Sequence, residues 1–108
     1  MSAVVQPLTR IRSVLPADLK AIAAVERASY KFPWSVGIFR DCMLAGYQGL
    51  VLEIGGVIGG YAIMSIAAGD AHILNLCVHP EYQQMGYGGR LLDNLLVEAE
   101  KVGVERVF

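Results

Sequence analysis

Three glycines that lie close together are the feature of this chain with the clearest chemical meaning. Gly86, Gly88 and Gly89 follow an apolar segment, residues 73–78, and precede an amphipathic segment, residues 91–101. A glycine-rich turn between a strand and a helix presents several backbone N–H groups to one point, at the positive end of the helix dipole. The spacing therefore predicts a loop that binds a phosphate compound.

Two common glycine-rich phosphate motifs do not fit this segment. A nucleotide P-loop places a lysine directly after its last glycine, and no lysine follows here. A dinucleotide-binding fingerprint needs Gly or Ala three residues after its second glycine, where this chain has Leu91. That fold also has its glycine turn after the first strand, whereas here the turn follows the fourth predicted strand. A plain structural turn remains the alternative for any single glycine.

The glycine turn lies within a regular succession of predicted elements. Apolar periodicity, glycines and prolines predict strands over 9–14, 49–54, 57–67, 71–78 and 104–108, and helices over 16–29, 36–45 and 91–101. Ser35 is the predicted N-cap of the second helix, and Gly46 and Gly103 are predicted to end the second and third helices. The last strand–helix–strand unit predicts a right-handed parallel crossover.

Residues 50–69 are apolar enough to be mistaken for a membrane span, because Glu53 is their only charged residue. The glycine pairs at 55–56 and 59–60 interrupt this stretch, which favours two strands joined by a Gly-Gly turn. Gly69 and Asp70 predict the next tight turn. The N-terminus also lacks the order of charges and apolar residues found in a secretory signal. We expect a cytoplasmic protein that does not enter a membrane.

The composition predicts a single domain and excludes some classes of partner. Nine basic and ten acidic residues give the chain of 108 residues a net charge of -1, without the basic patch typical of nucleic-acid binding. Cys42 and Cys77 have no CxxC spacing and are predicted to be buried, reduced thiols, and no metal site is expected. Cys77 as a nucleophile is the less favoured interpretation, because no histidine is spaced to activate it. We expect His79 to lie in a turn.

Gln83 opens a Gln-x-x-Gly-x-Gly pattern that ends at Gly88. This pattern resembles the acyl-CoA pyrophosphate loop of GNAT-type N-acetyltransferases, and the order of elements is also similar to that superfamily. Residues 75–82 (Asn-Leu-Cys-Val-His-Pro-Glu-Tyr) and 32–35 (Phe-Pro-Trp-Ser) resemble segments of bacterial ribosomal-protein-alanine N-acetyltransferases. The resemblance extends over residues 9–108.

The resemblance implies a fold and a cofactor. The implied fold is an α+β, three-layer acyl-CoA N-acyltransferase fold, with a mixed, mainly antiparallel sheet and helices on both faces. Residues 1–108 would form one incomplete domain, truncated after the start of the fifth strand. The implied cofactor is acetyl-CoA or CoA, with its pyrophosphate on the backbone amides of residues 84–89 and its pantetheine arm along a bulged strand. The implied cofactor-binding residues are Leu76, Cys77, Val78, Gln84, Met85, Gly86, Tyr87, Gly88 and Gly89.

The resemblance also implies an acceptor and the place of the catalytic groups. Phe32 and Trp34 would be either core or substrate-binding residues. The glutamate base and tyrosine acid of the family would lie beyond Phe108, so no catalytic residue is expected within the chain. The predicted function is acetyl transfer to a protein N-terminal amine, such as the alanine of a small-subunit ribosomal protein. A catalytically silent CoA-binding module, or acetyl transfer to lysine or a small amine, are the alternatives. An unpaired sheet edge predicts a homodimer or a higher oligomer.

Overall fold

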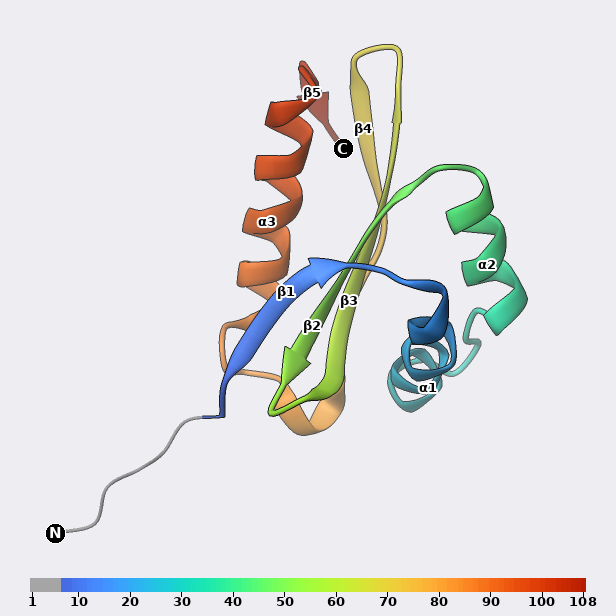
Figure 1. Ribbon diagram of the computed structural model, residues 1–108, viewed down its shortest axis with the longest axis vertical. Coiled ribbons are helices and arrows are strands. Elements are labelled where there is room, and N and C mark those ends of the chain that lie inside the picture. The colour runs from blue at the N-terminus through green and yellow to red at the C-terminus, as the bar shows by residue number, and fades with distance from the viewer. Residues whose placement is uncertain (1–6) are drawn as a thin grey trace, which may run out of the picture.

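The computed structural model describes residues 7–108, which fold as a sheet between two layers of helices (Figure 1). The elements are β1 (Thr9–Ser13), the 3-10 turn η1 (Pro16–Asp18), α1 (Leu19–Ser29), α2 (Val36–Leu44), β2 (Gln48–Ile54), β3 (Val57–Ala67), β4 (Asp70–Val78), the 3-10 turn η2 (Pro80–Tyr82), α3 (Tyr87–Lys101) and β5 (Arg106–Val107). Apart from the two 3-10 turns, their order and type agree with the sequence predictions.

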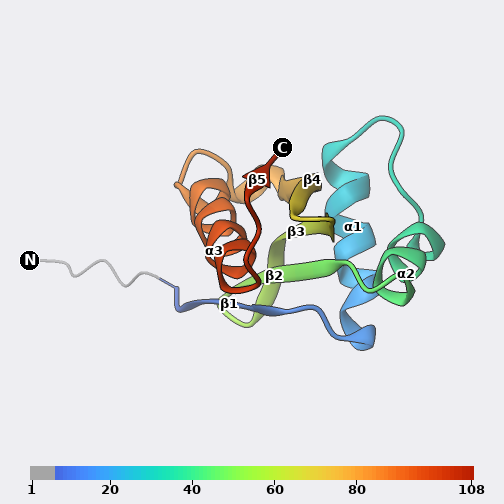
Figure 2. The same cartoon turned by 90° about the horizontal axis from the view of Figure 1, so that it is seen from above.

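The sheet has the strand order β1-β2-β3-β4-β5. Neighbouring strands are antiparallel from β1 to β4, and β5 is parallel to β4. Helices α1 and α2 cover one face and α3 covers the other (Figure 2). Each face has its own apolar core, because side chains along a strand point alternately to the two sides. The predicted three-layer, mainly antiparallel fold is confirmed.

Two tight turns join the central strands. Gly55 and Gly56 both have positive φ, +58° and +83°, as a two-residue hairpin between β2 and β3 requires. The turn between β3 and β4 consists of Ala68 and Gly69, whose φ angles are +52° and +82°. It lies one residue before the predicted turn, because Asp70 already pairs with Ala67.

Helix α3 starts earlier than predicted. The apolar periodicity becomes regular only at Leu91, but Tyr87 lies one turn before it and packs against the same core. Gly88 and Gly89 consequently lie in the first turn of α3, and Gly86 alone lies in the connecting loop. Strand β5 is shorter than the predicted 104–108.

The ends of the other helices agree with their sequence signals. Ser35 accepts a hydrogen bond from the Ile38 amide at 3.3 Å and caps α2. Gly46 and Gly103 follow α2 and α3 with φ of +81° and +79°. Within residues 7–108, no helix is both long and apolar enough to cross a bilayer.

Candidate functional site

The start of α3 concentrates unsatisfied backbone donors. Gly86 is the N-cap, and the Arg90 amide makes the first bond of the helix, to the Gly86 carbonyl at 3.2 Å. The amides of residues 86–89 donate no hydrogen bond to any other residue in the described part of the chain. Such amides lie at the positive end of the helix dipole and favour an anion.

A hollow of about 250 Å³ lies beside these amides, and we call it the loop hollow. It is lined by Val78, Tyr82, Gln83, Gln84, Gly86, Tyr87 and Gly88. A Cβ on Gly88 would lie 3.8 Å from Leu76 Cδ2 and 4.0 Å from Val78 Cγ2. A side chain at position 88 would therefore touch these two side chains at the wall of the loop hollow.

Gln83 ties the loop to the end of β4. Its side-chain amide donates to the Val78 carbonyl at 2.9 Å. The next residue, Gln84, adopts a left-handed conformation with φ of +65°, which turns the chain towards α3. The sequence pattern identified Gln83 as its first position, but not this bond.

A bulge in β4 decides which backbone groups face the edge of that strand. Ile63 pairs with Asn75 whereas Met64 pairs with Ile73, so Leu74 is an extra residue on β4. The His79 amide bonds the Gly59 carbonyl at 2.8 Å, so these two residues form a hydrogen-bonded pair. Along β3 and β4, opposite residues alternate between hydrogen-bonded and non-hydrogen-bonded pairs. Asn75 and Cys77 therefore direct their backbone groups towards β3. Leu76 and Val78 direct theirs away from it.

The opposite edge of β4 is only partly paired. Residues Asp70 and Ala71 pair with β5, and the Ile73 amide bonds the Phe108 carbonyl at 2.8 Å. From residue 74 to residue 78, β4 has no strand partner on this side among residues 7–108. This stretch, which we call the free β4 edge, ends at the loop hollow.

The predicted cofactor residues of β4 point to two faces of the sheet. The side chains of Leu76 and Val78 pack on the α3 side. Cys77 is only 4% exposed and packs on the α1 side with Tyr61. His79 accepts a hydrogen bond from the Glu81 amide at 3.1 Å and so caps η2, as expected for a turn residue. Within the described residues, no histidine lies against the Cys77 thiol to activate it.

A second hollow, of about 380 Å³, lies at the other end of the free β4 edge, and we call it the Glu26 hollow. It is lined by Glu26, Tyr30, Lys31, Phe32, Trp34, Leu74 and Asn75. Phe32 is 84% exposed at its rim, whereas Trp34 is half-buried with its ring 5.4 Å from that of Phe39. The structure brings these predicted substrate residues to one hollow, and Trp34 also contributes to the core.

Glu26 is the residue of this region that sequence reasoning missed. It is 2% exposed, and its carboxylate accepts hydrogen bonds from the Trp34 amide at 2.8 Å, from Asn75 Nδ2 at 3.0 Å and from the Tyr61 hydroxyl. Burial and the bond to Glu26 raise the pKa of Tyr61, so this hydroxyl stays protonated and donates. A sequence signal existed, because Glu26 interrupts the apolar stripe of α1 one turn after Ile22 and Ala23.

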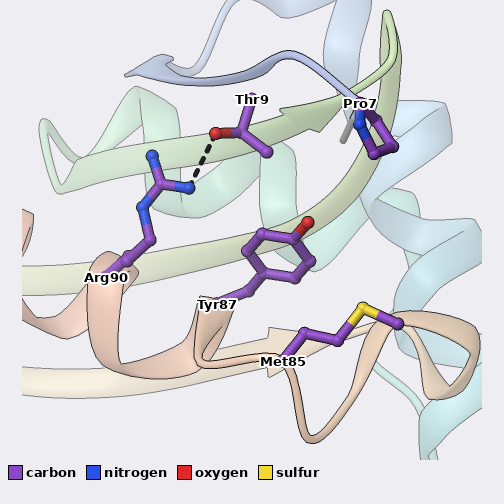
Figure 3. A pocket seen from close by; sticks show the side chains of 5 residues that line it. All are labelled: Pro7, Thr9, Met85, Tyr87 and Arg90. Carbon is purple, nitrogen blue, oxygen red and sulfur yellow. Dashed lines mark hydrogen bonds between the residues drawn. The ribbon is translucent and has the colours of Figure 1, made fainter. Parts of the chain in front are cut away.

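A third hollow, of about 510 Å³, flanks the glycine loop on the side of β1 (Figure 3). Pro7, Thr9, Met85, Tyr87 and Arg90 line it. The Arg90 guanidinium donates to the Thr9 hydroxyl at 2.7 Å. This bond holds a cation one turn into α3, which adds to the positive potential at the start of the helix.

Comparison with known proteins gives consistent relatives. The model of the acetyltransferase (GNAT) family matches residues 19–108. The chain is 33% identical over 101 residues to the ribosomal protein bS18-alanine N-acetyltransferase of Escherichia coli K12. The crystal structure of the ribosomal-protein-S18-alanine N-acetyltransferase from E. coli superposes with a TM-score of 0.85 over 90% of this chain. The PaiA N-acetyltransferase of Thermoplasma acidophilum, solved in complex with coenzyme A, shares the fold at 20% identity and a TM-score of 0.82.

The chain covers only part of these relatives. The sequence match spans 94% of this chain and 68% of the E. coli K12 protein. The structural matches span 63% of the E. coli crystal structure and 75% of the T. acidophilum one.

Proposed function

The chain belongs to the acetyltransferase (GNAT) family, and from that premise we propose that it binds acetyl-CoA at the loop hollow and takes part in acetyl transfer to a protein N-terminal amine. The proposed acceptor is an alanine at the start of a ribosomal protein, because relatives at 33% identity are named for that reaction. The proposed acceptor pocket is the Glu26 hollow, which contains Phe32 and Trp34.

One observation carries the cofactor proposal: the amides at the start of α3 donate to no described residue and lie beside a hollow that Gly86 and Gly88 line. A diphosphate is the anion that such a cradle suits, and each charge-assisted bond contributes about 1.5–3 kcal/mol. The proposed contacts are the backbone groups of Gln84, Met85, Gly86, Tyr87, Gly88 and Gly89.

The free β4 edge would hold the pantetheine arm. Leu76 and Val78 direct backbone groups to this edge, although the Val78 carbonyl already accepts from Gln83. The backbone proposal therefore rests on the Leu76 amide and carbonyl and the Val78 amide, and Cys77 would contribute only by shaping β4. Acetyl-CoA would supply the acetyl group as a thioester, and an edge amide would polarise its carbonyl. The proposal assigns neither the base nor the acid to a residue of this chain.

Calorimetry with acetyl-CoA, followed by an acetylation assay on an Ala-starting peptide, tests the proposal. The control peptide carries an acetylated N-terminus and an internal lysine. We expect acetyl-CoA binding, and slow transfer to the free N-terminus alone, because the proposed site brings thioester and amine together without an assigned base or acid. Binding without transfer would support the CoA-binding module instead, and transfer to the control peptide would support a lysine acceptor. No binding of acetyl-CoA would refute both.

We also propose that the chain self-associates through the free β4 edge and acts in the cytoplasm. Unpaired strand edges invite pairing with a second copy. Light scattering at micromolar concentration should give at least a dimer, and acetyl-CoA should compete with this association if both use the same edge. A monomer under these conditions would contradict the proposed self-association.

A further inference from the structure

We propose that Glu26 is a positioning residue for the acceptor: its carboxylate fixes the segment around Trp34 against β4 and so sets the shape of the Glu26 hollow. The inference rests on the proposed function, because it treats this hollow as the acceptor pocket. It adds a residue of α1 that does not touch the reacting atoms but holds the groups that would surround the acceptor.

The hydrogen bonds of Glu26 connect three separate segments. The Trp34 amide belongs to the connection between α1 and α2, the Tyr61 hydroxyl to β3 and the Asn75 amide to β4. The Asn75 amide also lies 3.3 Å from the Tyr61 hydroxyl, which closes the group. Burying a carboxylate is costly unless it is hydrogen-bonded, so these donors are what makes its position tenable. Moving any one segment would leave the carboxylate partly unsatisfied.

No cation pairs with Glu26 among residues 7–108. Elsewhere, buried or half-buried carboxylates are paired, as Asp18 and Glu53 are with Arg12. A simple stability role would be served by an apolar residue or an ion pair at position 26. The neutral donors instead bring together the residues that line the hollow, which points to a requirement for shape at this site.

The position of Asn75 connects Glu26 to the proposed reaction. Asn75 lies between Leu74, the bulge residue, and Leu76. Leu76 directs its backbone groups to the free β4 edge. The stretch from Leu74 to Val78 spans about 13 Å at the usual rise of a strand. The Glu26 hollow and the loop hollow therefore lie at the two ends of one extended edge. Glu26 fixes the end at which an acyl group and an amine would meet.

Replacing Glu26 by glutamine separates geometry from charge. A glutamine oxygen would still accept from the Trp34 amide. Its nitrogen would take the place of the oxygen that accepts from Tyr61 and Asn75. It would donate to the Tyr61 hydroxyl and, after a flip of the Asn75 side-chain amide, to Asn75 Oδ1. Glu26→Gln thus keeps the connection between the segments, whereas Glu26→Ala removes it. Glu53→Gln is the matched control, since Glu53 lies on β2 and bonds Arg12 of the edge strand β1 at 2.6 Å, away from β4.

Trp34 is the only tryptophan of the chain, so its fluorescence reports this segment alone. In Glu26→Ala we expect stronger acrylamide quenching of Trp34 and about tenfold weaker binding of an Ala-starting peptide at saturating CoA. Acetyl-CoA affinity, measured by calorimetry, should stay within about twofold of the unmodified chain, because the loop hollow is distant. Glu26→Gln and Glu53→Gln should behave as the unmodified chain does in all three measurements.

Several outcomes would overturn the inference. Unchanged quenching and peptide affinity in Glu26→Ala would show that Glu26 does not position this segment. An equal loss of peptide and acetyl-CoA affinity would show a general structural role, and a Gln variant as impaired as the Ala variant would show a need for charge. Failure of the unmodified chain to bind the peptide would show that the Glu26 hollow is not an acceptor pocket.

If Glu26→Ala does not fold, Asn75→Ala replaces it with the same expectations, because half-buried Asn75 donates to Glu26 at 3.0 Å.

The inference and the proposed function fail in different ways. Absence of acetyl-CoA binding in the unmodified chain would refute the cofactor site, but the quenching response of Trp34 would remain. Loss of that response, with acetyl-CoA binding intact, would refute the role of Glu26 alone.

Discussion

The two hollows at the ends of the free β4 edge are built from different parts of the polypeptide. The loop hollow lies beside main-chain amides of one continuous segment, residues 86–89, and Gly88 forms part of its wall. The Glu26 hollow depends on side chains from residues 26, 61 and 75, which only the tertiary structure brings together. A site of the first kind tolerates side-chain changes that preserve the backbone. A site of the second kind changes with each side chain.

The largest effect that distinguishes the two hollows should come from Gly88→Val. Valine would fill the loop hollow next to Leu76 and Val78. The loss of contacts to a diphosphate should weaken acetyl-CoA binding by about 3 kcal/mol, or about a hundredfold. Calorimetry measures the affinity, and thermal unfolding checks that the chain remains folded.

Gly37→Val is the matched control, because Gly37 occupies the same second position of α2 that Gly88 occupies in α3. A Cβ on Gly37 meets only Ser35 Oγ, at 3.6 Å. Acetyl-CoA affinity should be unchanged in this variant. Equal affinities of the two variants would contradict the proposed location of the diphosphate.

At the other end, Tyr61→Phe should destabilise the fold rather than the cofactor site. It leaves the buried Glu26 carboxylate without one of its donors, and such a loss costs about 2 kcal/mol. Denaturant unfolding measures this, with Tyr47→Phe at a partly exposed position as the control. A Tyr61 variant as stable as the Tyr47 variant would mean that the hydrogen bond between Tyr61 and Glu26 contributes little to stability.

Asp18 and Arg12 form an ion pair outside both hollows, and its contribution to the free energy of unfolding should depend on pH. Bonds from Arg12 at 2.7 and 2.9 Å, and one from the Leu15 amide, lower the pKa of Asp18. Since the pKa in the folded chain is below the unfolded value of about 3.9, the stabilisation is present above that pH and is lost as the pH falls through the folded pKa.

Asp18→Asn should therefore lower the free energy of unfolding at pH 7 by about 1.5 kcal/mol, and this difference should shrink below about pH 4. Denaturant titrations at several pH values measure it, and Asp93→Asn at an exposed position of α3 is the control. A difference that is independent of pH would rule out the ionised pair as its cause.

The smallest effect should come from removing the hydrogen bond between the Gln83 side chain and the Val78 carbonyl, which connects the loop to β4. Gln83→Ala removes the bond to the Val78 carbonyl and should weaken acetyl-CoA binding by about 1 kcal/mol, or about fivefold. Gln48→Ala, at the exposed start of β2, serves as the control. An unchanged affinity would show that Gln84 and the glycines hold the loop without Gln83.

The difference between the two hollows also explains how much could be predicted from the sequence. The order and type of the strands and helices, and the N-cap Ser35, follow local rules of periodicity and capping, and they were predicted correctly. The start of α3 was placed too late because glycines 88 and 89 read as a loop, whereas Tyr87 packs one turn before Leu91. The turn at Ala68 was missed by one residue because alanine is not a typical left-handed residue.

The glycine loop depends on local sequence, and the pattern from Gln83 to Gly88 falls on residues that line the loop hollow; that they bind a cofactor stays a prediction. The position of the bulge at Leu74, in contrast, depends on the pairing of two strands. Without that register, the sequence could not show that Cys77 directs its backbone groups to β3. Glu26 was missed for a similar reason, because its donors Tyr61 and Asn75 are distant in the chain.

Amide NMR spectra of the chain, recorded during a titration with acetyl-CoA, test the cofactor site most directly. The account predicts that the largest chemical-shift changes fall on the amides of residues 84–89 and of Leu76 and Val78, with little change in α2. Saturation with the largest changes in α2 or along β1 and β2, or no change at millimolar acetyl-CoA, would contradict it.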